Sequence, residues 1–220
     1  MITIWGVCRS RATRNIWALE ELGLPWRLRP VIQANRLLAK GIDPAAPDAP
    51  FNTRSREFLR LSPAGAVPVL EEDGFVLSES LAINLYLAGK TDGPLGPATP
   101  REEAQMLQWT LFGATSVESP ALAIQTLFGA GRSADDPEVK AAEDSLLRPL
   151  AVLEAHLTTH SHIVGGRFTI ADINMAEILR YAQPDAALMG RFPRVKGWLE
   201  LCQSRPAFKR MWQAREAEPA

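Results

Sequence analysis

An abrupt change of pattern near residue 100 constrains this chain more than any other feature. Before it, short apolar runs alternate with amphipathic segments, whereas the residues after it read as helices broken at prolines and glycines. Residues 90–100 hold five glycines and prolines, which is typical of a linker. The pattern therefore predicts a first domain over residues 1–89, a linker over 90–100 and an all-helical domain over 101–220.

The first domain is predicted to mix strands and helices. Residues 2–7 and 26–32 read as strands, and residues 12–22 between them place Ile16 and Leu19 on one helical face. A strand, a helix and a strand within about thirty residues indicate a parallel, right-handed crossover. A helix, a hairpin and a last helix capped by Ser78 follow, over residues 53–61, 67–77 and 78–88. The predicted order is βαβ-α-ββ-α.

Composition excludes several classes of protein. Hydrophobic residues make up 46% and charged residues 22%, enough for a substantial core. No run of about 18 uncharged apolar residues exists to span a membrane, and residues 1–5 lack the pattern of a secretory signal. The two cysteines, Cys8 and Cys202, are too few for a disulfide framework. We therefore expect a cytoplasmic protein without a membrane contact.

The charge is unevenly distributed along the chain. Residues 1–60 carry ten Lys or Arg and five Asp or Glu, although the formal net charge of the chain is -1. A basic region can attract a small anion or a nucleic acid. Its arginines are scattered and no aromatic residues interleave them, so we expect no nucleic-acid partner.

Four segments resemble the bacterial cytosolic glutathione S-transferase family, in the order and spacing of that family. They are the helix run SRATRNIWALEELGLP, the segments AGAVPVL and VLSESLAI, and the helix start FTIADI, at residues 10–25, 64–70, 76–83 and 168–173. The resemblance implies a thioredoxin-like first domain and a helical bundle as the second. It also implies a homodimer that conjugates glutathione, its co-substrate, to a small hydrophobic electrophile.

The resemblance implies that Ser10 is the catalytic residue. Ser10 stands where a strand ends and a helix begins. The free N–H groups and the dipole of a helix N-terminus favour an anion. A hydroxyl that donates to the sulfur of bound glutathione lowers the pKa of that thiol further. The alternatives are a purely capping Ser10, or Cys8 as the reactive group. A reactive Cys8 would form a mixed disulfide and catalyse thiol-disulfide exchange.

The same resemblance assigns glutathione binding to Val67, Pro68, Glu79 and Ser80. A cis peptide before Pro68 is expected, which would turn the N–H and C=O groups of Val67 toward an extended peptide. Ser80 at a helix N-terminus suits the carboxylate of the γ-glutamyl end, and Glu79 suits its ammonium group. Purely structural roles also remain open. Pro68 can be a proline at the start of an edge strand, and Glu79 and Ser80 can cap a helix.

The sequence departs from the family in the residue before Val67. Relatives often carry Lys there, and this chain has Ala66, so one expected contact to the glycine carboxylate of glutathione is missing. Residues 33–52 also form a longer segment than usual, which can fold over that end of the ligand or cover the cleft. Four basic residues remain as candidates: Arg36, Lys40, Arg54 and Arg56.

The electrophile is expected between the domains, where pockets often form. Trp109, Phe112 and Ser116, on the first helix after the linker, are the predicted wall of its pocket, although such a stripe is more often core. No metal is expected. Thr169 and Asp172 have the spacing of a structural capping box.

Two further functions stay open. A catalytically silent module of this family, used for protein association, would need none of Ser10, Val67–Pro68 and Glu79–Ser80. Relatives with glutathione-dependent isomerase activity carry a Ser-Ser-Cys-Ser run at the first helix, where this chain has residues 9–12, Arg-Ser-Arg-Ala.

Overall fold

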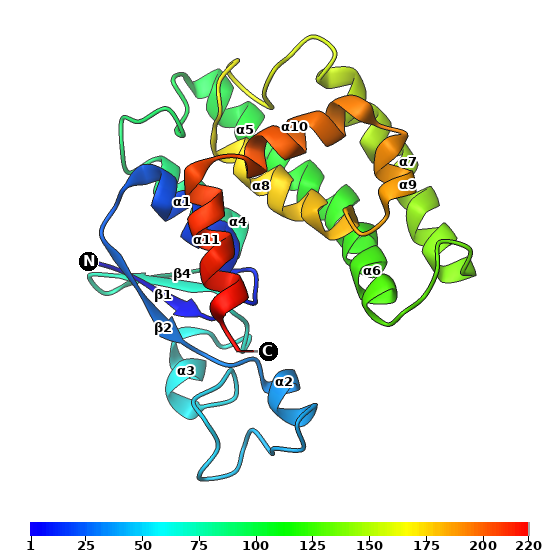
Figure 1. Ribbon diagram of the computed structural model, residues 1–220. Coiled ribbons are helices and arrows are strands. Elements are labelled where there is room, and N and C mark those ends of the chain that lie inside the picture. The colour runs from blue at the N-terminus through cyan, green and yellow to red at the C-terminus, as the bar shows by residue number, and fades with distance from the viewer. Residues whose placement is uncertain (220) are drawn as a thin grey trace. The chain divides into compact units, whose positions relative to one another are not determined.

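The computed structural model describes residues 1–219 and divides into two compact units (Figure 1). The first unit comprises Met1–Lys90 together with the segment that begins at Ala207, and the second comprises Thr91–Pro206. The segment after Ala207 therefore packs with the first unit, whereas the helical pattern alone grouped it with residues 101–206. An amphipathic pattern shows that a helix has a face to bury, but it does not show against which domain.

A four-stranded sheet in the order β2-β1-β3-β4 forms the centre of the first unit. Strand β1 (Ile2–Gly6) pairs in parallel with β2 (Trp26–Pro30) and antiparallel with β3 (Val69–Glu72), which continues through a hairpin into β4 (Phe75–Ser78). This confirms the predicted βαβ unit and hairpin. The thioredoxin-like arrangement places the ends of β1 and β3 side by side, with Trp5 opposite Val69.

Helices cover both faces of this sheet (Figure 1). Trp5 packs with Phe58 of α3 (Arg56–Leu61) on one face. Because side chains alternate along a strand, Ile4 points to the opposite face, where α1 (Ala12–Leu22) and α4 (Ser80–Ala88) pack against each other. Helix α3 begins three residues later than predicted.

Helix α11 (Pro206–Ala217) lies along α1 in the first unit (Figure 1). The Phe208 ring meets the fully buried Trp17 ring edge-on, with centroids 4.9 Å apart. Arg210 Nε donates to Glu20 Oε2 at 2.7 Å. An apolar contact and an ion pair thus fix the helix on α1.

A single buried asparagine organises the long segment between β2 and α3. Asn52 donates through Nδ2 to the carbonyls of Pro44, at 3.0 Å, and of Pro50, at 2.7 Å. Its Oδ1 accepts from the N–H of Arg54 at 2.8 Å. The segment also contains a short helix that the sequence analysis did not predict, α2 (Ala34–Leu38).

The second unit is helical, as predicted. Its α-helices are α5 (Pro100–Phe112), α6 (Glu118–Gly129), α7 (Pro137–His156), α8 (Ile170–Leu179), α9 (Ala186–Gly190) and α10 (Pro193–Gln203), and it also has a π-helical turn (Gly113–Val117) and a 3₁₀ turn (Arg180–Ala182). Within residues 1–219, no helix has the length and hydropathy needed to cross a membrane.

Every residue of α8 is buried, so this helix is the centre of the second unit. Asp172 accepts from the N–H of Thr169 at 2.8 Å and from its hydroxyl at 3.1 Å. The same carboxylate accepts from the N–H of Ile163 at 3.0 Å and from the indole of Trp198 at 2.9 Å. The capping box is confirmed, and Asp172 is bonded entirely within the core.

Candidate functional site

The end of β1, the start of α1 and the loop before β3 meet at one point of the first unit. A Cβ placed on Gly6 would lie 3.3 Å from Ala12 Cβ and 3.6 Å from Val67 Cβ. The peptide between Val67 and Pro68 is cis, as expected. Pairing of β3 with β1 begins at Val69, so Val67 lies just outside the sheet register.

Ser10 lies in the β1–α1 loop and is only 8% exposed. Its hydroxyl donates to the Val7 carbonyl at 2.6 Å and accepts from the N–H of Ala12 at 3.1 Å. Both partners belong to the same loop and helix start. A hydroxyl has one hydrogen to donate, so Ser10 must turn away from Val7 before it can donate to a bound sulfur.

Cys8 is buried in the same loop and lies under a segment that the sequence analysis did not associate with the site. The Glu218 carboxylate accepts from the N–H groups of Cys8, at 2.7 Å, and Arg9, at 2.6 Å. Burial raises the pKa of the Cys8 thiol, and the nearby Glu218 carboxylate raises it further. Both effects disfavour a Cys8 thiolate. No local sequence signal could have revealed a contact between residues this far apart in the chain.

Glu79 and Ser80 form the start of α4. Glu79 has a backbone φ of 67°, which is rare for a residue other than glycine. Such strained residues cluster at functional sites. Helix α4 begins at Ser80 with Glu79 as its N-cap, and the predicted cap at Ser78 is wrong because Ser78 pairs with Val69 as the last residue of β4.

Ser80 is buried against α1 through two side chains. Arg14 Nη1 donates to Ser80 Oγ at 3.1 Å, and Asn15 Nδ2 donates to the Ser80 carbonyl at 2.8 Å. Arg14 is itself 1% exposed, so a cation is held beneath the start of α4. Helix α1 thus connects the Ser10 loop with Ser80. Sequence reasoning missed Arg14 because a helical arginine is usually solvated.

The three residues expected to line a second-substrate pocket lie in the second unit. The Trp109 and Phe112 rings contact each other edge-on, 5.5 Å apart, and Trp109 also contacts His156 at 4.8 Å. Ser116 lies in the π-helical turn, and all three side chains are half-buried. Their packing is that of a partly exposed helical stripe.

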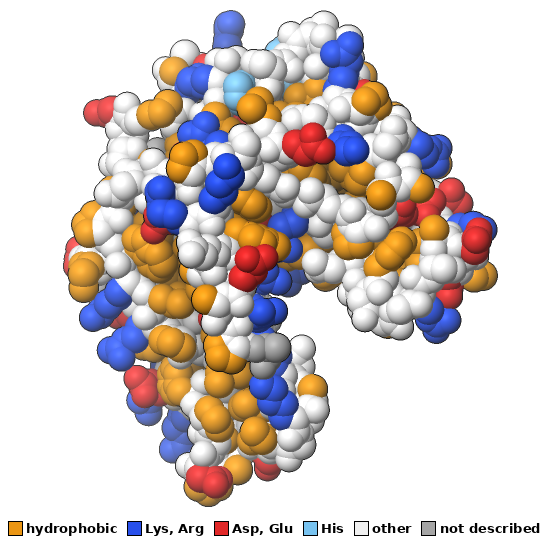
Figure 2. Space-filling view, in the orientation of Figure 1, with side chains coloured by type: hydrophobic (Ala, Val, Ile, Leu, Met, Phe, Trp, Pro, Cys, Tyr) orange, Lys and Arg blue, Asp and Glu red, His pale blue; other side chains and the backbone are white. Residues whose placement is uncertain are grey.

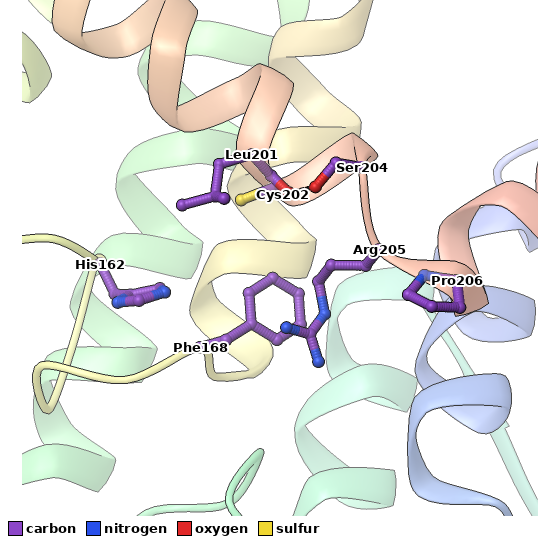
Figure 3. Close-up of a pocket in the computed structure, with 7 residues that line it drawn as sticks. All are labelled: His162, Phe168, Leu201, Cys202, Ser204, Arg205 and Pro206. Carbon is purple, nitrogen blue, oxygen red and sulfur yellow. Dashed lines mark hydrogen bonds between the residues drawn. The ribbon is translucent and has the colours of Figure 1, made fainter.

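A different hollow of about 410 Å³ opens in the second unit (Figure 3). The guanidinium of Arg205 lies 3.9 Å from the centroid of the Phe168 ring, and Cys202 lies near the same ring (Figure 3). None of Trp109, Phe112 and Ser116 lines this hollow. Its lining consists of His162, Phe168, Leu201, Cys202, Ser204, Arg205 and Pro206.

The histidines near the end of α7 interact with one another and with backbone. The His156 and His160 rings stack with centroids 4.2 Å apart, and His156 Nε2 lies 3.0 Å from the Ile163 carbonyl. Burial, and then His160, lower the pKa of His156. Residues 1–219 contain no group of three or more His, Cys, Asp or Glu residues arranged to hold a metal ion.

Two family models match most of the chain. The glutathione S-transferase N-terminal domain matches residues 10–90, and the glutathione S-transferase C-terminal domain matches residues 106–206. Among curated proteins, elongation factor 1-gamma of Sus scrofa is 32% identical over 157 residues, which cover 70% of this chain and 36% of that protein. The chain thus spans about a third of the length of this relative.

Solved structures give the same result over whole chains. A glutathione S-transferase from Pseudomonas fluorescens is 28% identical, with a TM-score of 0.76, and the match covers 94% of this chain and 96% of that one. The glutathione transferase URE2P8 from Phanerochaete chrysosporium, solved with oxidized glutathione, is 27% identical, with a TM-score of 0.75 and coverage of 98% and 95%. With both domains matched in order, this chain belongs to the glutathione S-transferase family.

Proposed function

We propose that this protein is a glutathione transferase that conjugates the thiolate of glutathione to a small hydrophobic electrophile. The observation that supports this proposal is the close approach of the Gly6 backbone to both the start of α1 and Val67, which leaves little room for a Cβ, next to the cis peptide before Pro68. This close approach brings the Val67 edge of the loop, which lies outside the pairing of β3 with β1, next to the N-terminus of α1. An extended peptide can pair with such an edge while its thiol faces the helix terminus.

In this proposal different residues bind the backbone of glutathione and its γ-glutamyl end. Val67 pairs with the peptide backbone, and the N–H and hydroxyl of Ser80 take the γ-glutamyl carboxylate. The buried Arg14 guanidinium, 3.1 Å from Ser80 Oγ, adds positive charge beneath that carboxylate. Glu79 pairs with the ammonium group, since its carboxylate is exposed at the start of α4.

Ser10 supplies the catalytic hydrogen bond. Its hydroxyl turns from the Val7 carbonyl to the sulfur and stabilises the thiolate, while the N–H groups of α1 contribute the dipole. Trp109, Phe112 and Ser116 remain our proposal for the wall that receives the electrophile. Reductase chemistry through Cys8 is the weaker alternative, because burial and Glu218 both raise the pKa of the Cys8 thiol.

A protein-association module is the second candidate, and one comparison favours it. The curated relative that is 32% identical is named as an elongation factor and not as a transferase. In that case Ser10 would serve only the local fold of its loop, as its bonds to Val7 and Ala12 allow.

Substitution of Ser10 by Ala decides between the two. A hydrogen bond to a charged sulfur contributes about 1.5–3 kcal/mol, so the pKa of bound glutathione should rise by about one to two units. Turnover near neutral pH should fall about tenfold or more. Thiolate absorbance, titrated in the binary complex, measures the pKa directly.

The matched control is Ser62→Ala. Ser62 is also buried, and its hydroxyl donates to the Ala66 carbonyl at 3.0 Å and accepts from the N–H of Ala66 at 3.3 Å. It should lower stability without moving the pKa of the thiol. If neither variant moves that pKa, and the wild type turns over no electrophile, the association module is the correct function.

We further propose that the protein is a cytoplasmic homodimer, since two-fold association is the commonest symmetry of soluble oligomers. Light scattering at micromolar concentration should give twice the chain mass of 24.2 kDa. A monomer mass across that range would contradict the proposal.

A further inference from the structure

A carboxylate of the chain itself is bound at the loop that carries Ser10. The Glu218 oxygens accept from two consecutive backbone N–H groups, those of Cys8 at 2.7 Å and Arg9 at 2.6 Å. Successive N–H groups that converge on one anion form a concave anion-binding nest. The loop therefore has the geometry to hold a carboxylate through both of its oxygens.

Two arginines surround this nest. Arg9 Nε donates to the Glu218 carbonyl at 2.8 Å, and Arg215 Nη1 donates to the Cys8 carbonyl at 3.0 Å. Both side chains are only half-buried. Figure 2 shows Lys and Arg side chains gathered beside the C-terminal end of α11 on the visible face. The surroundings thus add positive charge to a site that already binds an anion.

The nest lies one and two residues before Ser10 in the same loop. Ser10 itself is bonded to Val7, on the other side of Cys8 in sequence. A ligand held by the Cys8 and Arg9 N–H groups is therefore next to the start of α1, where the proposed thiolate forms. Glu218 reaches the loop from a separate segment, so it can leave without the loss of any hydrogen bond within α1.

We propose that the N–H groups of Cys8 and Arg9 form a binding site for the carboxylate of the electrophilic substrate, and that Glu218 fills this site as an internal substitute. The inference rests on the proposed function, because the electrophile is defined by its reaction with glutathione. The substrate class is a small aromatic or unsaturated electrophile that bears a carboxylate. The Glu218 carboxylate withdraws when the substrate binds, and Arg215 stays bonded to the loop.

A suitable pair of probes is 4-chloro-3-nitrobenzoate and its neutral amide, 4-chloro-3-nitrobenzamide. In both, the glutathione thiolate attacks the carbon that bears chlorine, a C–S bond forms, and chloride leaves with the electron pair of the C–Cl bond. The carboxylate or amide is unchanged by the reaction. The two probes therefore differ in the group that would enter the nest.

Glu218→Ala should raise kcat/KM for the benzoate and leave the amide within about twofold. If Glu218 fills the nest about nine-tenths of the time, its removal raises apparent affinity about tenfold. Glu218→Gln, which keeps the shape but loses the charge, should give a smaller increase. The control is Glu216→Ala, because the Glu216 carboxylate accepts from Trp212 at 2.9 Å and not from the loop. It should leave both rates unchanged.

An equal change for both probes would show that Glu218 only supports the loop, and no change for either would show that the nest is unused; each result overturns the proposal. Calorimetry with 3-nitrobenzoate and 3-nitrobenzamide, without glutathione, separates this proposal from the proposed function. Selective benzoate binding that is tighter in Glu218→Ala supports the nest even if no variant conjugates glutathione. Equal binding of the two compounds by every variant refutes it.

Discussion

The loop before α1 and the start of α8 both bind a carboxylate through backbone N–H groups, but the two carboxylates come from different parts of the chain. At α8, Asp172 accepts from the N–H of Thr169, three residues away, within a fully buried capping box. At the loop before α1, the accepting carboxylate is that of Glu218, which is 210 positions from Cys8. Both carboxylates accept hydrogen bonds from backbone N–H groups. Only the Asp172 carboxylate belongs to the same capping box as its donor.

The difference separates a structural helix start from a loop that can take a ligand. The Asp172 carboxylate cannot leave without unfolding α8, since it also holds Ile163 and Trp198. Glu218 is half-buried and comes from another segment. We infer that a carboxylate within its own capping box supports the core, whereas a remote, half-buried carboxylate on a loop can be exchanged for a ligand.

The largest expected effect comes from Asp172→Ala. It leaves four buried donors without their acceptor, and we expect a loss of about 3–5 kcal/mol in the free energy of unfolding. Urea unfolding followed by tryptophan fluorescence measures this loss. Asp92→Ala, at an exposed loop position in the same unit, should stay within about 0.5 kcal/mol. A stable Asp172→Ala protein with reduced activity would break the comparison, because α8 would then be the functional terminus.

Glu79→Gly tests whether the strained backbone of Glu79 is kept because its side chain binds glutathione. Glycine adopts a φ of 67° without steric cost, so stability should rise by about 0.5–1 kcal/mol. Calorimetry should show at the same time a loss of glutathione affinity of about tenfold, since the partner of the ammonium group is gone. Glu71→Gly, in the regular strand β3, should instead lower stability. Unchanged affinity in Glu79→Gly would remove Glu79 from the site.

The smallest expected effect is on the thiol of Cys8. Burial raises the pKa of that thiol and the Glu218 carboxylate raises it further, so Glu218→Gln should lower the pKa in part and increase the thiolate fraction at a given pH. Alkylation of Cys8 near pH 8 should then become severalfold faster. Peptide mass spectrometry measures the alkylation of Cys8 and of the buried Cys202 in one sample, and Cys202 serves as the internal control. An unchanged rate would mean that Glu218 does not act on the loop in solution.

Much of the fold could be predicted because it depends on local patterns. The strands β1 and β2, the hairpin and α1 follow from periodicity and turn residues. The Thr169–Asp172 box follows from a three-residue spacing. The four glutathione-binding candidates came from family motifs, since serines, glutamates and prolines in these positions also have ordinary structural roles.

The missed features depend on neighbours that are distant in sequence. A cap at Ser78 was as reasonable locally as a start at Ser80, and pairing with Val69 decided it. Short α2 lacks the length for a clear periodic signal. Arg14 gained significance only when α1 packed against α4 and brought its guanidinium to Ser80.

The sequence by itself determined the class of each domain, the order of elements and the family, since these need only spacing along the chain. The tertiary structure alone decided that α11 packs on α1 and that Glu218 lies on the Ser10 loop. The physical reason is the same for both. The sequence shows that an apolar helix face must be buried and that a charged side chain needs a group of opposite charge or a hydrogen-bond donor. Only the packing of the whole unit decides which helix or loop is near enough to provide it.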